Sequence, residues 1–379
     1  MRRFWILPLF FSVLILFFSG RAAAVELPEE YCDFYESIPD DVVEMLPNGI
    51  FSADAGEVSE SLTNALSAKS LLDLARELLI GSMPGAFSLF CILVCLMVLS
   101  VLANNLAETF GGSGTKDALV YASSLCASVI VSAMQFPRIT AAGAFFQRIC
   151  VMMNSMIPVM TALYIAGGNT AAAAVSASSM LIQINLIELC ATSLVVPSVC
   201  ACMALTLADS FRTGSGSLSG IVGSIKHTLT FIFGLCGTLL MASLAGQKII
   251  AAASDNAGAR AVKFLAGNMI PVVGSTVGDT LRTLAASVRL LRSTVGVAGI
   301  LTLALLLLPF LIELLLTRLA LNSAASFGEM LGCKNLVKLS REIASLYGYV
   351  IAAAAMASVL CVLSLTLFAV GSTAIGGLG

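Results

Sequence analysis

The chain has 379 residues, of which 58% are hydrophobic and only 11% carry a charged side chain. Soluble globular proteins carry about 25% charged residues, so this composition excludes most soluble enzymes. The formal net charge is −2, and no basic face argues for a nucleic-acid partner.

The first 24 residues have the pattern of a secretory signal peptide. Arg2 and Arg3 form a positive end, Phe4 to Phe18 is apolar, and Ala22 to Ala24 supplies small residues for cleavage before Val25. Cleavage would place the mature N-terminus outside the cytoplasm. The alternative is an uncleaved first span.

Residues 25–81 form a polar segment that we expect to be extracytoplasmic. It is acidic at first, and a helical pattern then runs from Val58 to Ile80, with one apolar side formed by Leu62, Leu66, Leu72, Ala75 and Leu79. This spacing predicts an amphipathic helix. Such a helix lies on the membrane surface, packs on a partner, or packs on the protein's own transmembrane helices.

Long windows without any charge follow one another along the rest of the chain. A hydrocarbon core about 30 Å thick needs about 20 apolar residues in a helix, and unpaired backbone amides are costly in lipid. The windows therefore predict an all-α, polytopic transmembrane bundle with seven or eight spans. They are Glu77–Glu108, Asp117–Arg138, Arg148–Glu188, Glu188–Asp209, Lys226–Lys248, Arg292–Glu313 and Glu342 to the last residue.

We expect a first group of transmembrane helices in residues 82–247 and a second in 293–379, which ends in a Gly-rich tail. Ala118–Phe136 and Ile149–Ala166 are expected as separate spans. Gly167, Gly168 and Asn169 then interrupt the pattern. Ala171–Ala208 holds two short spans or one long helix bent at Pro197.

Residues 248–292 have intermediate polarity and predict an amphipathic or re-entrant segment. Its centre contains Gly267, Asn268, Pro271, Gly274, Gly278 and Asp279. Pro271 disfavours helix before it, and the glycines permit tight bends or close contacts. One hypothesis is that this element lines a pore or cavity, because irregular backbone at membrane depth needs protein or water beside it. The other is a helix–helix contact through Gly274 and Gly278.

We interpret the charged residues near the predicted spans as structural rather than functional. Arg282, Arg289 and Arg292 share a helical face and are expected to reach lipid phosphates. Glu188, Asp209 and Glu313 fall near the ends of predicted spans, where exposure lowers the cost of a charge. Glu188 and Glu313 are the candidates if the protein is a proton-coupled transporter. The eleven cysteines lie mostly in apolar windows, where a free thiol acts as a small hydrophobe.

Sequence motifs for catalysis are missing. The chain has one histidine, no phosphate-binding Gly-x4-Gly-Lys-Ser/Thr loop and no Cys or His spacing typical of zinc. We therefore predict no catalytic residue, no cofactor and no metal site, and a protein that is not an enzyme.

Three motifs resemble the stage III sporulation protein AE family, and the resemblance covers essentially the whole chain. They are Gly167 to Ala171, the run from Arg260 through Ile270-Pro271-Val272-Val273-Gly274 to Asp279, and Val295-Gly296-Val297-Ala298-Gly299. The resemblance implies a multi-pass protein of the mother-cell membrane facing the forespore. It implies a part in the channel that links the two compartments, with the other stage III A operon proteins and the forespore stage II Q protein as partners.

A stand-alone secondary transporter is the alternative. Transporters often have interrupted helices in corresponding positions of two halves. The interruptions at Gly167–Thr170 and Gly267–Gly278 lie about 100 residues apart, although the segments around them do not otherwise repeat.

Overall fold

A computed structural model describes residues 68–110, 113–167, 170–210, 218–268 and 274–370, together with a few residues between 31 and 46. Helices and short turns make up this part of the chain. Its elements are α3 (Asp40–Val43), α5 (Ala68–Phe110), α6 (Ser113–Ala166), α7 (Thr170–Ile187), the π-helix η1 (Glu188–Val195), α8 (Val196–Ser210), α9 (Ser219–Asn268), α10 (Gly274–Leu331) and α11 (Lys334–Val370).

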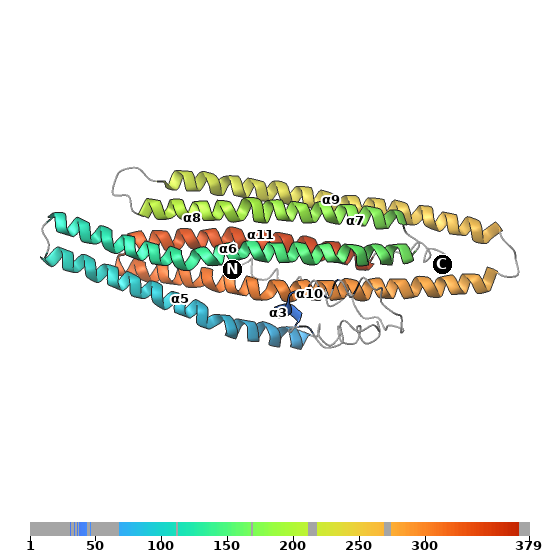
Figure 1. The fold of residues 1–379 in the computed structure, drawn as a ribbon, viewed down its shortest axis with the longest axis horizontal. Helices are drawn as coiled ribbons and strands as arrows, with labels where there is room; N and C mark the ends of the chain where they lie inside the picture. The colour runs from blue at the N-terminus through green and yellow to red at the C-terminus, as the bar shows by residue number, and fades with distance from the viewer. Residues whose placement is uncertain are drawn as a thin grey trace.

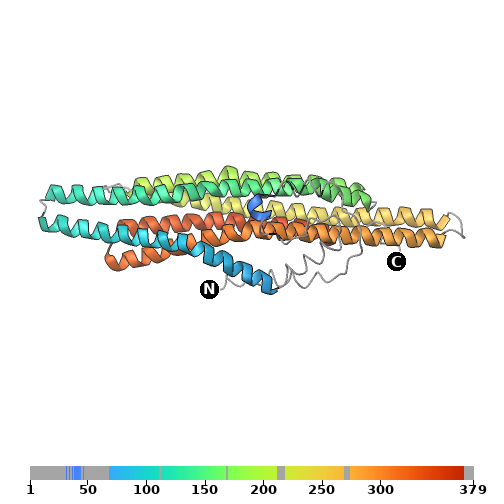
Figure 2. The same ribbon diagram turned by 60° about the horizontal axis from the view of Figure 1, so that its bottom comes forward.

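The long helices run almost parallel to one another in an elongated bundle (Figure 1). The C-terminal ends of α5, α8 and α10 and the N-terminal ends of α6, α9 and α11 lie at one end of the bundle, which we call the α10–α11 end (Figure 1). The α6–α7 and α9–α10 connections lie at the opposite end, called the α6–α7 end. There α9 and α10 extend beyond the other helices (Figure 2).

Six helical segments are long and apolar enough to cross a membrane: Arg76–Leu106, Tyr121–Ala166, Ala172–Asp209, Ser219–Ser243, Leu291–Leu331 and Lys334–Ala369. This confirms the prediction of an all-α, polytopic bundle. The number is close to the seven or eight spans expected. The main difference is α6, which joins the two spans predicted at Ala118–Phe136 and Ile149–Ala166 into one helix.

The segment α7–η1–α8 forms one continuous span, the second of the two alternatives predicted for this region. The π-helix η1 ends at Val195, two residues before Pro197, and the N–H of Val196 bonds to the carbonyl of Ala191, five residues back. Pro197 has no N–H and its ring clashes with the preceding turn. The wider turn relieves this conflict without ending the helix.

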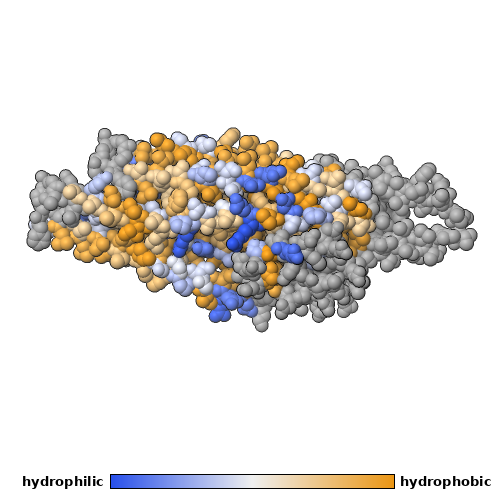
Figure 3. Space-filling view, in the orientation of Figure 1, coloured by the Kyte–Doolittle hydropathy of each residue, from blue (hydrophilic) through white to orange (hydrophobic). Residues whose placement is uncertain are grey.

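The helices are longer than a bilayer needs. Helix α6 has 54 residues, about 80 Å at 1.5 Å per residue, against a hydrocarbon core about 30 Å thick. Arg138, Arg148, Glu188 and Glu313 fall inside the membrane-length segments. Because these segments are longer than the hydrocarbon core, the expectation that Glu188 and Glu313 lie near span ends stays a prediction. Hydrophilic surface gathers near the middle of one face, with apolar surface to either side (Figure 3).

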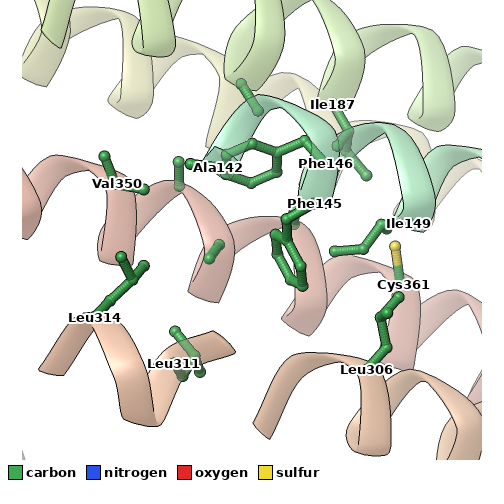
Figure 4. Packing of buried hydrophobic residues seen from close by; sticks show 14 of the residues in the cluster. Ala142, Phe145, Phe146, Ile149, Ile187, Leu306, Leu311, Leu314, Val350 and Cys361 are labelled. Carbon is green, nitrogen blue, oxygen red and sulfur yellow. The ribbon is translucent and has the colours of Figure 1, made fainter. Parts of the chain in front are cut away.

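The core of the bundle is centred on α6, α10 and α11. Phe145 of α6 stacks on Phe310 of α10 with ring centroids 3.8 Å apart. Ile149, Leu306 and Cys361 bring the same three helices together beside this pair (Figure 4). Lipid tails are as apolar as these side chains, so close packing rather than transfer from water holds such helices together.

Glycine allows α10 to approach its neighbours closely. A Cβ at Gly296 would lie 2.6 Å from the Cβ of Ala369 on α11, and one at Gly299 would lie 2.9 Å from Met156 on α6. Distances below 3 Å are not tolerated without movement. The small-residue run around Gly296 is therefore required by the packing of α10 against α11.

The side chain of Arg292 lies inside the bundle rather than at the membrane surface, where the sequence predicts it. Its side chain is only 1% exposed, and its Nη2 donates to the carbonyl of Phe368 at 3.0 Å. The guanidinium carbon lies 4.1 Å from the ring centroid of Tyr164 and 5.3 Å from that of Phe368. The prediction that Arg292 reaches lipid phosphates is wrong, because the side chain is buried inside the bundle, where it contacts a backbone carbonyl and two aromatic rings. The side chains of Arg282 and Arg289 lie outside the described residues.

Two of the cysteines are joined rather than free. Cys190 of η1 and Cys236 of α9 form a disulfide. For this pair the interpretation as small hydrophobes is wrong, because the fold brings together two residues 46 positions apart. Eight cysteines of the described part are free, including the buried Cys150, Cys202, Cys333 and Cys361.

The N-terminal segment packs on the bundle through an apolar side. Tyr31, Phe34, Ile38 and Val42 are buried at three- and four-residue spacings, and α3 contacts α10. Of the amphipathic helix predicted at Val58–Ile80, residues 58–67 lie outside the described part. From Ala68 onward the pattern belongs to α5, which continues without a break into the first span.

Candidate functional site

The residues predicted as structural or pore-lining lie at the α6–α7 end of the bundle. Gly167 is buried, and its N–H bonds to the carbonyl of Leu163 at 3.2 Å. Gly267 and Asn268 end α9, while Gly274, Gly278 and Asp279 lie in the first turns of α10. Gly168, Asn169 and Pro271 lie outside the described residues. The pore-lining and helix-contact hypotheses for this region both stay predictions.

A cavity of about 510 Å³ lies in the middle of the bundle instead. Helices α6 and α10 form most of its wall, Tyr347 of α11 adds to it, and Ser82 of α5 and Val42 of α3 reach its rim. Its polar lining includes Arg138, Arg148, Glu313 and Thr317. Helices far apart in sequence therefore build one polar site at mid-length.

Two prolines help to form the cavity. Pro137 of α6 and Pro309 of α10 both line it and both lie inside their helices. A proline inside a helix removes the hydrogen bond to the carbonyl four residues earlier. For Pro309 that carbonyl belongs to Leu305, which also lines the cavity.

Hydrogen bonds fix the polar side chains on one side of the cavity. Nη1 of Arg138 donates to Oγ1 of Thr317 at 3.1 Å. One turn earlier on α6, the buried Gln135 accepts a bond from the hydroxyl of Tyr347 at 2.7 Å. These two bonds connect α6 with α10 and with α11 at the same level of the bundle.

Glu313 lies one turn before Thr317 on α10 and adds an exposed carboxylate to the wall. The site therefore offers guanidinium donors, a carboxylate and hydroxyls. Such a set can bind a small polar or charged solute, and its groups interact strongly because the surroundings have a low dielectric constant. In the described part of the chain no three His, Cys, Asp or Glu side chains are grouped to hold a metal ion.

Sequence reasoning identified Glu313 but not the residues around it. Gln135, Arg138, Thr317 and Tyr347 come from three helices separated by long stretches of chain. One signal was available. Ser128, Ser132 and Gln135 follow one another at helical spacing within a charge-free window and mark a polar stripe on an apolar helix.

Several other charged groups form ion pairs near the α10–α11 end. Oδ2 of Asp209 lies 2.7 Å from Nζ of Lys338, and Oδ1 of Asp209 accepts the N–H of Leu218 at 2.7 Å. This agrees with the expected place of Asp209 near a span end. Lys226 pairs with Glu342 at 2.5 Å and also bonds Ser345. These contacts join α8, α9 and α11 and need no functional explanation.

Comparisons with known proteins agree with this architecture. The family model for stage III sporulation protein AE matches residues 55–372. The curated stage III sporulation protein AE of Bacillus subtilis (strain 168) is 24% identical over 392 residues, covering 97% of both chains. No solved structure matches. This chain, with its membrane-length helices, belongs to the stage III sporulation protein AE family.

Proposed function

We propose that this protein is an integral component of the transenvelope channel that links the mother cell with the forespore and is required for forespore development. The observation that carries the proposal is the family match over residues 55–372 in a chain with six membrane-length helices. The proposed role is structural and transport-related and includes no catalytic step.

In the proposed topology the protein spans the mother-cell membrane with its mature N-terminus outside the cytoplasm, facing the forespore. The signal-peptide pattern of residues 1–24 supports this orientation. With six spans, the end of α11 lies on the same side as the N-terminal segment. Lys334, Lys338 and Arg341 at the α10–α11 end would then face the cytoplasm, where positive residues are favoured.

The proposed partners are the other stage III A operon proteins and the forespore stage II Q protein. Apart from the family resemblance, long helices support an assembly role. Segments longer than the hydrocarbon core place part of a protein outside it or force the bilayer to adapt. The outer helices α5 and α9 also offer surface to partners, because only 17% of their apolar windows is buried.

Genetic replacement and co-purification test the proposal. Deleting the gene in its endospore-forming host should abolish heat-resistant spores, and a tagged wild-type copy should restore them. The tagged protein, purified in detergent from sporulating cells, should carry the operon partners and the stage II Q protein. Normal spore numbers after deletion, or a protein purified alone, would overturn the proposal.

A stand-alone secondary transporter is the second candidate, and the central cavity favours it. The cavity lies inside membrane-length helices and contains Glu313, one of the two acids expected for proton coupling. Purified protein in liposomes should then accumulate a solute by itself, and Glu313→Gln should abolish uptake. Glu329→Gln is the matched control, because Glu329 lies on the same helix but pairs with Arg341 far from the cavity.

A further inference from the structure

Three buried polar side chains of α6 and α11 each have one atom without a hydrogen-bond partner. Ser132 is 7% exposed, Gln135 is 0% exposed and Ser340 is 1% exposed. Oγ of Ser132, Nε2 of Gln135 and Oγ of Ser340 find no partner among the described residues. Gln135 and Ser132 belong to α6 and Ser340 to α11, and these two helices are in contact.

Other hydroxyls in this bundle behave differently. Thr161, Thr206, Ser358 and Thr366 each donate to the carbonyl four residues earlier in their own helix. A serine inside a membrane helix usually satisfies itself in this way. Ser132 and Ser340 do not, so their hydroxyls are available to another group.

The three side chains lie close to one another and to the central cavity. The bond between Tyr347 and Gln135 fixes the register of the two helices, and both run from the α10–α11 end to the α6–α7 end (Figure 1). Ser132 is one turn from Gln135, and Ser340 is two turns, about 10 Å, from Tyr347 in the same direction. Tyr347 itself lines the cavity.

Burial without a partner is costly for any polar atom, and nearly all such atoms in folded proteins bond to protein or to ordered water. Water occupies buried sites that offer it two or more polar partners. The seam offers hydroxyls, an amide and a phenol within a few turns. It continues on one side into a cavity with charged groups.

We propose that water fills this seam, so that Ser132, Gln135, Ser340 and Tyr347 form a hydrated polar track. The track connects the α10–α11 end of the bundle with the cavity that holds Arg138 and Glu313. Its ligand is water, and it admits water-sized solutes to the seam between α6 and α11 from one end of the protein. The inference holds for the isolated chain and does not depend on its place in a larger assembly.

Thiol accessibility tests the track in the full-length protein. Ser132→Cys and Ser340→Cys are nearly isosteric changes, and each variant, purified in detergent, is treated with a small cationic methanethiosulfonate. Modification of each cysteine is followed by peptide mass spectrometry, so the native cysteines stay in place. Ser358→Cys is the matched control, because Ser358 is 4% exposed on the same helix as Ser340 and bonds its own backbone.

The two track cysteines should react at least about tenfold faster than the cysteine introduced in the Ser358→Cys control or the native Cys361, because a thiolate forms only where water reaches it. Reaction of both at the control rate would overturn the proposal.

Alanine variants give an independent measurement. In a dry seam, Ser132→Ala and Ser340→Ala would remove unsatisfied hydroxyls and raise the melting temperature in detergent. In a hydrated track they remove a partner of water and leave the melting temperature unchanged or lower. A rise in both variants contradicts the track.

Discussion

The inner helices α10 and α11 and the outer helices α5 and α9 are all long enough to span a membrane, but they are stabilised in different ways. In the apolar windows of α10 and α11, 67% and 56% of the residues are buried, whereas in α5 and α9 only 17% are. The outer helices need little beyond apolar side chains and their own backbone hydrogen bonds to persist in lipid. The inner pair depends on close contacts and specific polar bonds, so we expect substitutions to be costly there and mild outside.

The largest loss of stability is expected where the backbones of α10 and α11 come closest. Gly296→Val should destabilise the protein by about 3 kcal/mol or prevent folding, because the new side chain would overlap Ala369 and approach the carbonyl of Leu365. Gly234→Val on α9 is the control, since nothing lies within 4 Å of a Cβ there. Thermal unfolding in detergent measures both. If the Gly296→Val and Gly234→Val variants melt at the same temperature, inner and outer helices do not differ in their tolerance of added side chains.

Replacing Arg292 with Met should come next in size. The change removes the bond to the Phe368 carbonyl and the contacts with two aromatic rings, and should cost about 2 kcal/mol. Arg341→Met, at an exposed position on α11, is the matched control. Early proteolysis at the end of α11 in the Arg292→Met variant would support the difference between inner and outer positions. Equal unfolding of the Arg292→Met and Arg341→Met variants would contradict it.

Tyr347→Phe should have a moderate effect. It leaves the buried Oε1 of Gln135 without its donor and should cost about 1–2 kcal/mol. Adding Gln135→Leu should recover part of the loss, because both polar groups are then gone. Unfolding of the two single variants and the double variant gives the coupling between the residues. A coupling of zero would mean that this bond does not hold α6 against α11.

The smallest effect is expected for Glu329→Gln. The Glu329–Arg341 pair is 2.7 Å long, but its side chains are about half exposed, at 49% and 52%. Water screens such pairs, so the change should alter stability by less than about 0.5 kcal/mol, and less again in high salt. A melting temperature well below wild type would show that inner helices also rely on their exposed charges.

The sequence predicted the class of fold because long charge-free windows have one physical solution in lipid. It did not predict that α6 is continuous, because Arg138 and Arg148 separate two charge-free windows in the sequence. Those two residues lie inside a single helix, where the polar cavity accommodates them. Length and polarity predict where helices lie in the sequence. Whether a charged residue can sit in the middle of a helix depends on the contacts that this helix makes with its neighbours.

The candidate site could not be predicted for the same reason. The groups beside Glu313 come from positions such as Arg138 and Tyr347, which meet only after three helices have packed. Arg292 is similar, since its aromatic partners Tyr164 and Phe368 lie on two other helices. Local sequence patterns place such residues on one face of a helix. They do not show which residue of another helix packs against that face.

The π-helix η1 sets the rotational phase of everything that follows it in the span. An i to i+5 turn takes in one residue more than an ordinary helical turn, and one residue corresponds to about 100° of rotation. The wider turn takes up that extra residue, so the buried side of α8, with Cys202 and Thr206, still faces the bundle. Deleting one residue between Glu188 and Val195 should therefore restore ordinary α-helical winding and leave this side of α8 facing α6 and α11, whereas one further inserted residue would turn it away by about 100°.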